Sequence, residues 1–222
     1  MFRESRVTVV DQPRSARREA TRQRILDAAR VVFAEKGVFG ASIEDICEQA
    51  GFTRGAVYSN FADKDDILRA VIEREQETLL AGITESFPIV DEEIAAAQTL
   101  EQAVAAIVNR MLRSLPIERQ FILIATELEL HAVRRAELAS LFVNGTRTFR
   151  ARLADALVEA MRRVGREPQV DAIDIIDGVM AIGQESFRAA LIAGPDADPY
   201  RLPETILPAM LLSLSRPIGT TD

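Results

Sequence analysis

Three short amphipathic segments separated by glycine-bearing turns fill residues 21–68, and this arrangement most constrains what the chain can fold into. In the first segment, apolar residues recur at i, i+3, i+4, i+7 and i+8 from Ile25 to Phe33. That spacing places them on one face of a helix. We therefore predict a helix over about 21–36, ended by Gly37, since glycine is favoured just past a helix C-terminus.

The second and third segments begin with residues that cap helices. Ser42 and Asp45 have the spacing of a capping box, in which each side chain bonds the other residue's backbone N–H. The helix that they start should end at Gly51, and Thr53 is placed to cap a third helix over 53–61. Two helices joined by so short a glycine-bearing turn are typical of a helix-turn-helix.

The third predicted helix is the candidate DNA-contacting element, because the second helix of this motif lies in the major groove. Small side chains at Gly55, Ala56 and Ser59 would let its backbone approach the bases closely. Arg54 is the best candidate for a bidentate guanine contact, and hydroxyl, amide and ammonium groups nearby suit phosphates. The predicted DNA-contacting residues are Ser42, Thr53, Arg54, Gly55, Ala56, Tyr58, Ser59, Asn60 and Lys64.

Three groups of residues stand at fixed spacings within residues 21–68. They are Phe33 with Gly37; Ser42, Ile46, Cys47, Ala50 and Gly51; and Gly55, Tyr58, Phe61, Lys64 and Leu68. Through these residues, roughly 50 of 222, the chain resembles the DNA-binding domain of the TetR family of bacterial transcriptional regulators. Cys47 stands where that family usually has alanine, and Asn60 stands where histidine is frequent.

Charge is distributed unevenly along the chain. The net charge is −7, yet residues 1–62 carry ten Lys and Arg against eight Asp and Glu, which leaves −9 on the remainder. Seven of those arginines fall within residues 1–24. We predict that residues 1–18 are a flexible basic arm that contacts phosphates or a minor groove. A solvated tail that adds only nonspecific attraction is an equal alternative.

Catalysis and metal binding are not indicated. His131 is the only histidine and Cys47 the only cysteine, and they fall in different predicted helices, which disfavours a Cys/His catalytic pair or metal site. We therefore expect no enzyme activity, catalytic residue, metal or cofactor. A single cysteine and the lack of any 18-residue apolar run predict a cytoplasmic protein without a membrane span.

The second half of the chain predicts further helices and no strands. They are expected over 65–86, 99–115, 118–135, 136–164 and 170–193, with one more after Pro203. Phe87, Pro88 and the acidic residues 91–93 should break the pattern after the first of these. The predicted fold is all-α: the arm 1–18, a helix-turn-helix DNA-binding domain over 19–65, and a larger helical ligand-binding and dimerisation domain over 66–222.

The family resemblance implies two sites in that larger domain. One is a cavity for a small-molecule effector, for which the candidate lining residues are Met111, Phe121, Thr126, Phe142, Phe149 and Gln184. The other is a homodimer interface formed by the last two helices, for which the candidates are Ile173, Ile176, Met180, Phe187, Leu207, Met210 and Leu211. Apolar residues at helical spacing are also ordinary core, so both sets have that alternative.

The resemblance predicts a sequence-specific transcriptional regulator, and a repressor rather than an activator. As a two-fold dimer it would bind a near-palindromic double-stranded operator, and the effector would release it by binding one state of the dimer better than the other. The alternative is a helical binding or adaptor protein that retains the motif without using it to contact DNA.

Overall fold

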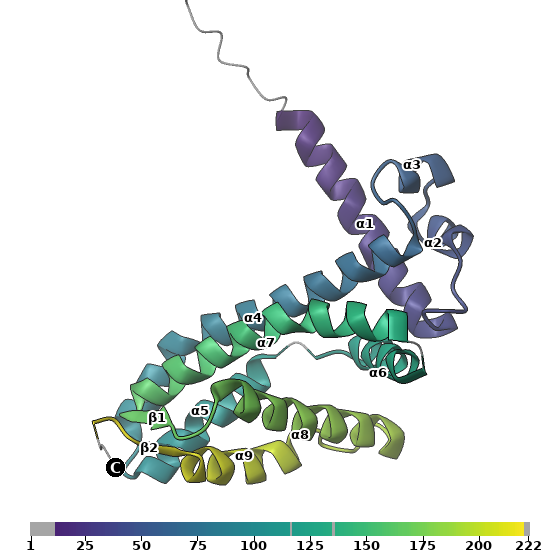
Figure 1. The fold of residues 1–222 in the computed structure, drawn as a ribbon. Helices are drawn as coiled ribbons and strands as arrows, with labels where there is room; N and C mark the ends of the chain where they lie inside the picture. The colour runs from purple at the N-terminus through teal and green to yellow at the C-terminus, as the bar shows by residue number, and fades with distance from the viewer. Residues whose placement is uncertain (1–11, 116, 135, 220–222) are drawn as a thin grey trace, which may run out of the picture. The chain divides into compact units, whose positions relative to one another are not determined.

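The computed structural model describes residues 12–115, 117–134 and 136–219, and within these it describes only the backbone of 12–15 and 136–145. The chain divides into two compact units, Met1–Val71 and Ile72–Asp222. Nine helices and two three-residue strands make up the regular structure of the described part (Figure 1). The prediction of a helical fold is confirmed.

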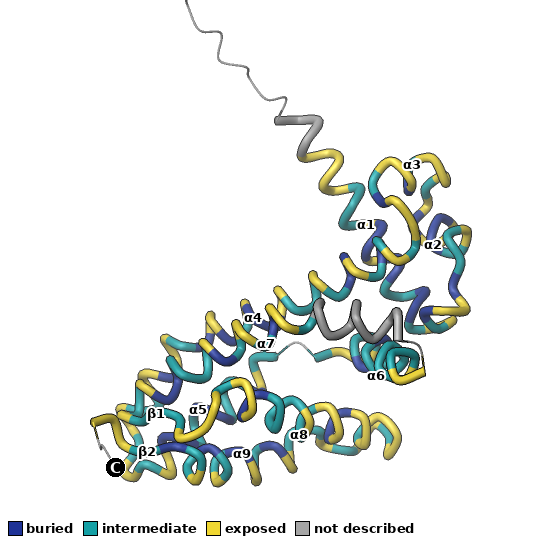
Figure 2. The backbone as a smooth tube through the Cα atoms, in the orientation of Figure 1, coloured by how far each residue is buried: buried dark blue, intermediate teal, exposed yellow. Residues whose placement is uncertain are grey.

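The first unit contains α1 (Gln12–Lys36), α2 (Ile43–Ala50), α3 (Arg54–Tyr58) and the first two turns of α4 (Lys64–Ala96). Each helix contributes one apolar face to the core. The residues that are at most 2% exposed are Ile25, Leu26, Ala29, Phe33, Val38, Ile46, Val57, Phe61, Ile67 and Val71. Dark blue segments along these helices mark buried residues in Figure 2. The outer faces are left to polar residues, as the helical period predicts.

Helix α1 begins at Gln12, nine residues before the predicted start at Thr21. The segment predicted as a flexible arm is therefore helical from residue 12, and residues 1–11 lie outside the described part. Apolar periodicity gives no signal here because residues 16–20 are all exposed. Pro13 is tolerated in a first helical turn, and arginine, alanine and glutamate are good helix formers.

The predicted helix caps are confirmed. Ser42 and Asp45 form the full capping box at the start of α2. Gly51 ends that helix in the left-handed conformation (φ +68°), which glycine adopts without steric cost. Thr53 then caps α3, accepting a hydrogen bond from the Ala56 N–H at 3.3 Å. These local interactions set the length of the turn between α2 and α3.

Gly40 is required for steric reasons. A Cβ atom built at this position would lie 2.4 Å from the Lys36 carbonyl oxygen, a backbone atom that cannot move aside alone. A Cβ atom at Gly55, in contrast, would come no closer than 3.9 Å to the Thr53 hydroxyl. We expect Gly40→Ala to destabilise the first unit by roughly 1–3 kcal/mol. The measurement is urea unfolding followed by circular dichroism.

Gly55→Ala is the matched control for that experiment. The same methyl group is added in open space within a helix, so stability should be unchanged or rise by up to about 1 kcal/mol. Equal effects of the two substitutions would show that the close approach at Gly40 does not matter.

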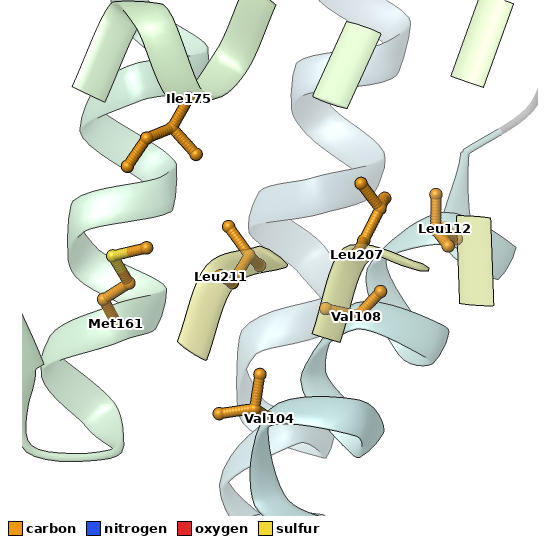
Figure 3. Packing of buried hydrophobic residues seen from close by; sticks show 7 residues of the cluster. All are labelled: Val104, Val108, Leu112, Met161, Ile175, Leu207 and Leu211. Carbon is orange, nitrogen blue, oxygen red and sulfur yellow. The ribbon is translucent and has the colours of Figure 1, made fainter. Parts of the chain in front are cut away.

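The second unit contains the rest of α4 with α5 (Leu100–Ser114), α6 (Arg119–Arg134), α7 (Ala136–Arg163), α8 (Ala172–Ala193) and α9 (Arg201–Ser213). Helix α5 packs against α9, and α7 packs against both α6 and α8. One buried cluster of this unit takes residues from α5, α7, α8 and α9, and Figure 3 shows its members Val104, Val108, Leu112, Met161, Ile175, Leu207 and Leu211.

Helix α4 continues to Ala96, ten residues beyond the predicted end at Ser86. The prediction of a break at Phe87, Pro88 and the acidic residues 91–93 was wrong. An internal proline removes one helical hydrogen bond, but the apolar face continues across it. Val90 is fully buried in a cluster that includes Ile107, and Phe87 and Ile94 pack against this cluster. Burial of this face stabilises the helix beyond the proline.

Two short strands were also missed. β1 (Arg166–Pro168) pairs antiparallel with β2 (Ser215–Pro217), with Glu167 opposite Arg216. The Arg216 Nε atom donates to Glu167 Oε1 at 2.9 Å across the pair. Three-residue strands ending in proline have no alternation to detect, and their partners lie 49 residues apart in sequence. The pairing fixes the end of α9 beside the α7–α8 connection.

Candidate nucleic-acid interface

The interface is built on α3, which one buried residue anchors to its unit. Val57 is fully buried, whereas Arg54, Gly55, Tyr58 and Ser59 on the same short helix or its end are exposed. In Figure 2 much of the segment labelled α3 is yellow, the colour of exposed residues. The structure therefore brings the predicted base-contacting residues onto one solvent-facing surface.

Arg54 is held by partners on two helices. Its Nη1 atom lies 2.5 Å from Glu44 Oε1 on α2, and its Nη2 atom lies 3.5 Å from the Tyr58 hydroxyl. The hydrogen bond to Tyr58 and the negative charge of Glu44 raise the pKa of the Arg54 guanidinium. Glu44 was not among the predicted residues, because its contact with Arg54 depends on how α2 and α3 pack against each other.

Ser59 and Asn60 complete the C-terminal end of α3. The Ser59 hydroxyl donates to the Ala56 carbonyl at 2.8 Å, and the Asn60 Nδ2 atom donates to the same carbonyl at 2.9 Å. Their polar groups thus satisfy the Ala56 carbonyl, close to a helix end that leaves carbonyls without helical partners. The DNA contacts that we predicted for these residues would require the same groups to be shared with this capping role.

Arginines of α1 support the same end of α3. Arg18 donates to the Ser59 carbonyl at 3.2 Å, and Arg22 donates to the Asn60 carbonyl at 3.3 Å. The Arg22 guanidinium also lies 4.3 Å from the centre of the Phe61 ring. Cations at a helix C-terminus are favourable because the exposed carbonyls carry partial negative charge. Two arginines that the sequence only marked as basic therefore hold the orientation of α3.

Arg24 has the corresponding role at the end of α2. It donates to the Ala50 carbonyl at 3.3 Å, and its guanidinium lies 4.6 Å from the centre of the Phe52 ring. Arg18, Arg22 and Arg24 of α1 therefore make contacts within the first unit itself.

Two predicted phosphate-contacting residues have internal partners. The Lys64 ammonium donates to the carbonyls of Val38 at 3.0 Å and Ala41 at 2.9 Å, which leaves one of its three N–H groups. The Ser42 hydroxyl donates to Asp45 Oδ2 at 2.7 Å and accepts from the Asp45 N–H. Both residues join the α1–α2 turn to the helices beside it.

The Asp45 carboxylate gives the first unit a pH-dependent stability. Hydrogen bonds from Lys36, at 2.6 Å, and from Ser42 hold the pKa of this carboxyl well below its usual range. A lowered folded-state pKa contributes stability that is present above the unfolded pKa of about 3.9 and lost as the pH falls below it. We expect the urea midpoint of the first unit to fall between about pH 5 and pH 2.5.

Asp45→Asn tests this contribution. The variant should be less stable at pH 6 and should lose less stability on acidification, because the titrating group is gone. Glu48→Gln, which removes an exposed acid from the same helix, is the control and should keep the wild-type pH profile. An identical profile for wild type and Asp45→Asn would contradict the assignment.

The described residues give no sign of metal or thiol chemistry. No group of three or more His, Cys, Asp and Glu among them is placed to hold a metal ion. Cys47 is buried in the core of the first unit, and burial raises the pKa of its thiol, which keeps it protonated and unreactive. No helix in the described part is long and apolar enough to cross a membrane.

Five of the six predicted effector-binding residues have side chains in the described part, and these lie in different surroundings. Phe149 is buried beside Phe121, in a cluster with Leu79 and Leu80 of α4. Gln184 is exposed and donates to Glu129 Oε1 at 2.9 Å. Thr126 is half-buried on α6, and the Phe142 side chain lies outside the described part.

Met111 lines a cavity between α5, α7 and α9. This cavity measures about 50 Å³ and is walled by apolar side chains, with Arg166 and Ser215 at the strand pair. Pockets that hold drug-sized ligands measure about 300–1,000 Å³. The cavity is therefore too small for such a ligand in this conformation.

Four residues predicted for the dimer interface belong to the chain's own core. Ile176, Phe187, Leu207 and Leu211 are at most 9% exposed, so the core alternative applies to them. Phe187 packs edge-on against the Tyr200 ring with centroids 5.2 Å apart. Helical periodicity identifies an apolar face but does not show what covers that face.

The exposed apolar face of α8 and α9 lies beside those residues. Ile173 is 40% exposed, and Met180 and Met210 are half-buried. On α9, Leu202, Ile206 and Ala209 are all exposed at i, i+4 and i+7. A Cβ atom at Gly178 would meet Met210 of the same chain, whereas one at Gly183 would meet nothing within 4 Å. Gly183 and the α9 stripe are thus the positions where another helix has room to approach.

Comparison with known proteins places this geometry in context. Residues 25–71 match the family model described as bacterial regulatory proteins, tetR family. The HTH-type transcriptional regulator SrpR of Pseudomonas putida is 46% identical over 70 residues, which are 32% of this chain and 33% of SrpR. The chain thus matches only about a third of this relative's length.

Solved structures match the fold over most of the chain. A putative TetR-family regulator from Mesorhizobium loti superimposes with a TM-score of 0.65 at 19% identity, covering 89% of this chain and 96% of that one. FadR of Bacillus subtilis, solved in complex with stearoyl-CoA, gives a TM-score of 0.60 at 20% identity, covering 86% and 97%. At these identities the likeness is one of fold.

Proposed function

We propose that this chain, whose residues 25–71 match the family model of bacterial regulatory proteins, tetR family, represses transcription by binding a specific operator through α3. The observation that carries the proposal is the outer face of α3. There Arg54, Gly55 and Tyr58 are exposed together on a helix fixed by buried Val57 and the Thr53 cap. A helix presented this way fits the major groove with its N-terminal residues at base edges.

Each residue has a defined part in the proposed contact. Arg54, at the first position of α3, is placed to donate two hydrogen bonds to guanine O6 and N7. Gly55 presents no side chain, so the backbone can approach the bases. The Tyr58 hydroxyl suits a phosphate oxygen, and phosphate contacts fix the register of a protein on the duplex.

The test uses duplexes selected from a random library by the wild-type protein. Arg54→Ala should weaken binding to the selected duplex by roughly 5- to 100-fold, since a bidentate base contact contributes about 1–3 kcal/mol of discrimination. Binding to a scrambled duplex should change much less. Arg69→Ala, an exposed arginine on α4 paired with Asp66, is the matched charge control. An unchanged preference in Arg54→Ala would favour the adaptor alternative.

The proposed operator is an inverted repeat bound by a homodimer. The exposed stripe of Leu202, Ile206 and Ala209 on α9, with Gly183 on α8, supports an interface at these two helices. A two-fold dimer places its α3 helices about one helical turn of DNA apart, roughly 34–36 Å. Four of the originally predicted interface residues remain in the core, and this stripe takes their place.

We also propose that a small molecule with an apolar body releases the operator. The apolar cavity lined by Met111 and Leu157 supports this class of ligand, and FadR was solved with a fatty-acyl compound, stearoyl-CoA. Because the cavity is small in this conformation, a ligand would have to favour a second, more open state. Thermal stabilisation by acyl compounds of graded length is the direct measurement.

A further inference from the structure

Glu44 is an exposed acidic residue beside the proposed DNA-contacting face of α3. It occupies the first turn of α2 next to Asp45, but only Asp45 serves the capping box and the Lys36 ion pair. The Glu44 side chain is 57% exposed, and its carboxylate reaches across the turn to Arg54. An acidic group at this position repels phosphates and by itself would weaken DNA binding. We therefore ask what favourable contact Glu44 makes.

The contacts of Arg54 suggest that role. Glu44 Oε1 lies 2.5 Å from Arg54 Nη1, and the Tyr58 hydroxyl lies 3.5 Å from Arg54 Nη2. Each terminal nitrogen of a guanidinium carries two hydrogens, so each keeps one hydrogen after these contacts. Those two remaining hydrogens suffice for an end-on bidentate contact with guanine O6 and N7.

We propose that Glu44 is a positioning residue that orients the Arg54 guanidinium for guanine and so determines base specificity. The proposal rests on the proposed function, in which α3 contacts DNA bases. Arginine has many side-chain rotamers, and fixing one of them before binding lowers the entropy cost of the base contact. Glu44 also neutralises Arg54 locally, which weakens its attraction to phosphates at random sites.

The two effects have opposite signs, and this makes the proposal testable. Removal of Glu44 should weaken binding to the selected duplex, because Arg54 loses its orientation. The same change should strengthen binding to a scrambled duplex, because an acidic charge is lost near phosphates. A purely electrostatic role would instead strengthen binding to both duplexes.

The experiment measures dissociation constants of the full-length protein for the library-selected duplex and for a scrambled duplex of equal composition, at several salt concentrations. Glu44→Ala should weaken selected-duplex binding about three- to ten-fold. Glu44→Gln keeps an acceptor for Arg54 without the charge, and it should recover most of this loss. Glu48→Ala removes an exposed acid from the same helix and is the control for charge alone.

The Arg54→Ala variant is a second background, in which the positioning of Arg54 can be distinguished from other effects of Glu44. In Arg54→Ala protein, Glu44→Ala should no longer weaken the selected duplex. Repeating the library selection with Glu44→Ala should relax the preference for guanine at one position of each half-site. Circular dichroism of each variant checks that α2 is intact.

Three results would overturn the proposal: tighter binding of Glu44→Ala to both duplexes, equal losses in Glu44→Ala and Glu44→Gln, or an unchanged loss in the Arg54→Ala background. If wild-type protein selects no sequence at all, the proposed function fails and this inference fails with it. If wild type discriminates but Glu44→Ala behaves like Glu48→Ala, the inference alone fails.

Discussion

Gly55→Leu is expected to abolish sequence-specific DNA binding while leaving the first unit at least as stable as before. Gly55 is exposed in α3, and a Cβ atom there meets nothing closer than 3.9 Å. Replacing a helical glycine with leucine gains up to about 1 kcal/mol of helix propensity. A leucine side chain would nevertheless hold the α3 backbone away from the bases. We expect a loss of about 100-fold or more in affinity for the selected duplex, since specific binding exceeds nonspecific binding by at least about 10³-fold.

Gln49→Leu is the matched control for this variant. It places the same apolar side chain at an exposed position of α2 without changing charge, and it should keep the preference of wild type. Fluorescence anisotropy with labelled duplex measures affinity, and urea unfolding measures stability. Full specific affinity in Gly55→Leu would mean that α3 does not approach the bases at this point.

Ile206→Glu is expected to convert the protein to a monomer and to weaken operator binding by about 100-fold or more. Ile206 is 42% exposed in the apolar stripe of α9 that we assign to the dimer interface. An unpaired carboxylate buried between two subunits would cost several kcal/mol. Loss of the dimer also removes the second half-site contact, which otherwise forms at high effective concentration.

Sedimentation equilibrium measures the oligomeric state in that experiment. Ile89→Glu is the control, because Ile89 on α4 is 45% exposed and lies outside the α9 stripe. It should leave both mass and DNA affinity unchanged. A dimeric Ile206→Glu protein would place the interface elsewhere.

Local features of the first unit were predictable from sequence. The Ser42 capping box, the Thr53 cap and the turn at Gly51 depend on residues within a few positions of one another, and all three were confirmed. The Arg54–Glu44 pair and the arginine contacts to Ser59 and Asn60 were not predictable, because they join residues 10 to 41 positions apart. Such contacts depend on how α1, α2 and α3 pack.

The second unit shows why periodicity alone leaves a site undetermined. Leu207 and Ile206 are neighbours in sequence, yet Leu207 is 2% exposed and Ile206 is 42% exposed. Both belong to the apolar pattern of α9, and we predicted only Leu207 for the dimer interface. The packing of α5 against α9 separates core from surface. At Pro88 the local pattern wrongly predicted the end of a helix. Burial around Val90 outweighed the tendency of the proline to break the helix.

The most direct test of the account is selection of binders from a random duplex library with purified protein at near-physiological salt, where nonspecific phosphate binding is weakened. The account predicts an inverted repeat whose half-sites lie about one helical turn apart and each contain a guanine that Arg54→Ala no longer requires. Recovery of sequences without a common motif, bound with equal affinity by wild type and Arg54→Ala, would contradict it.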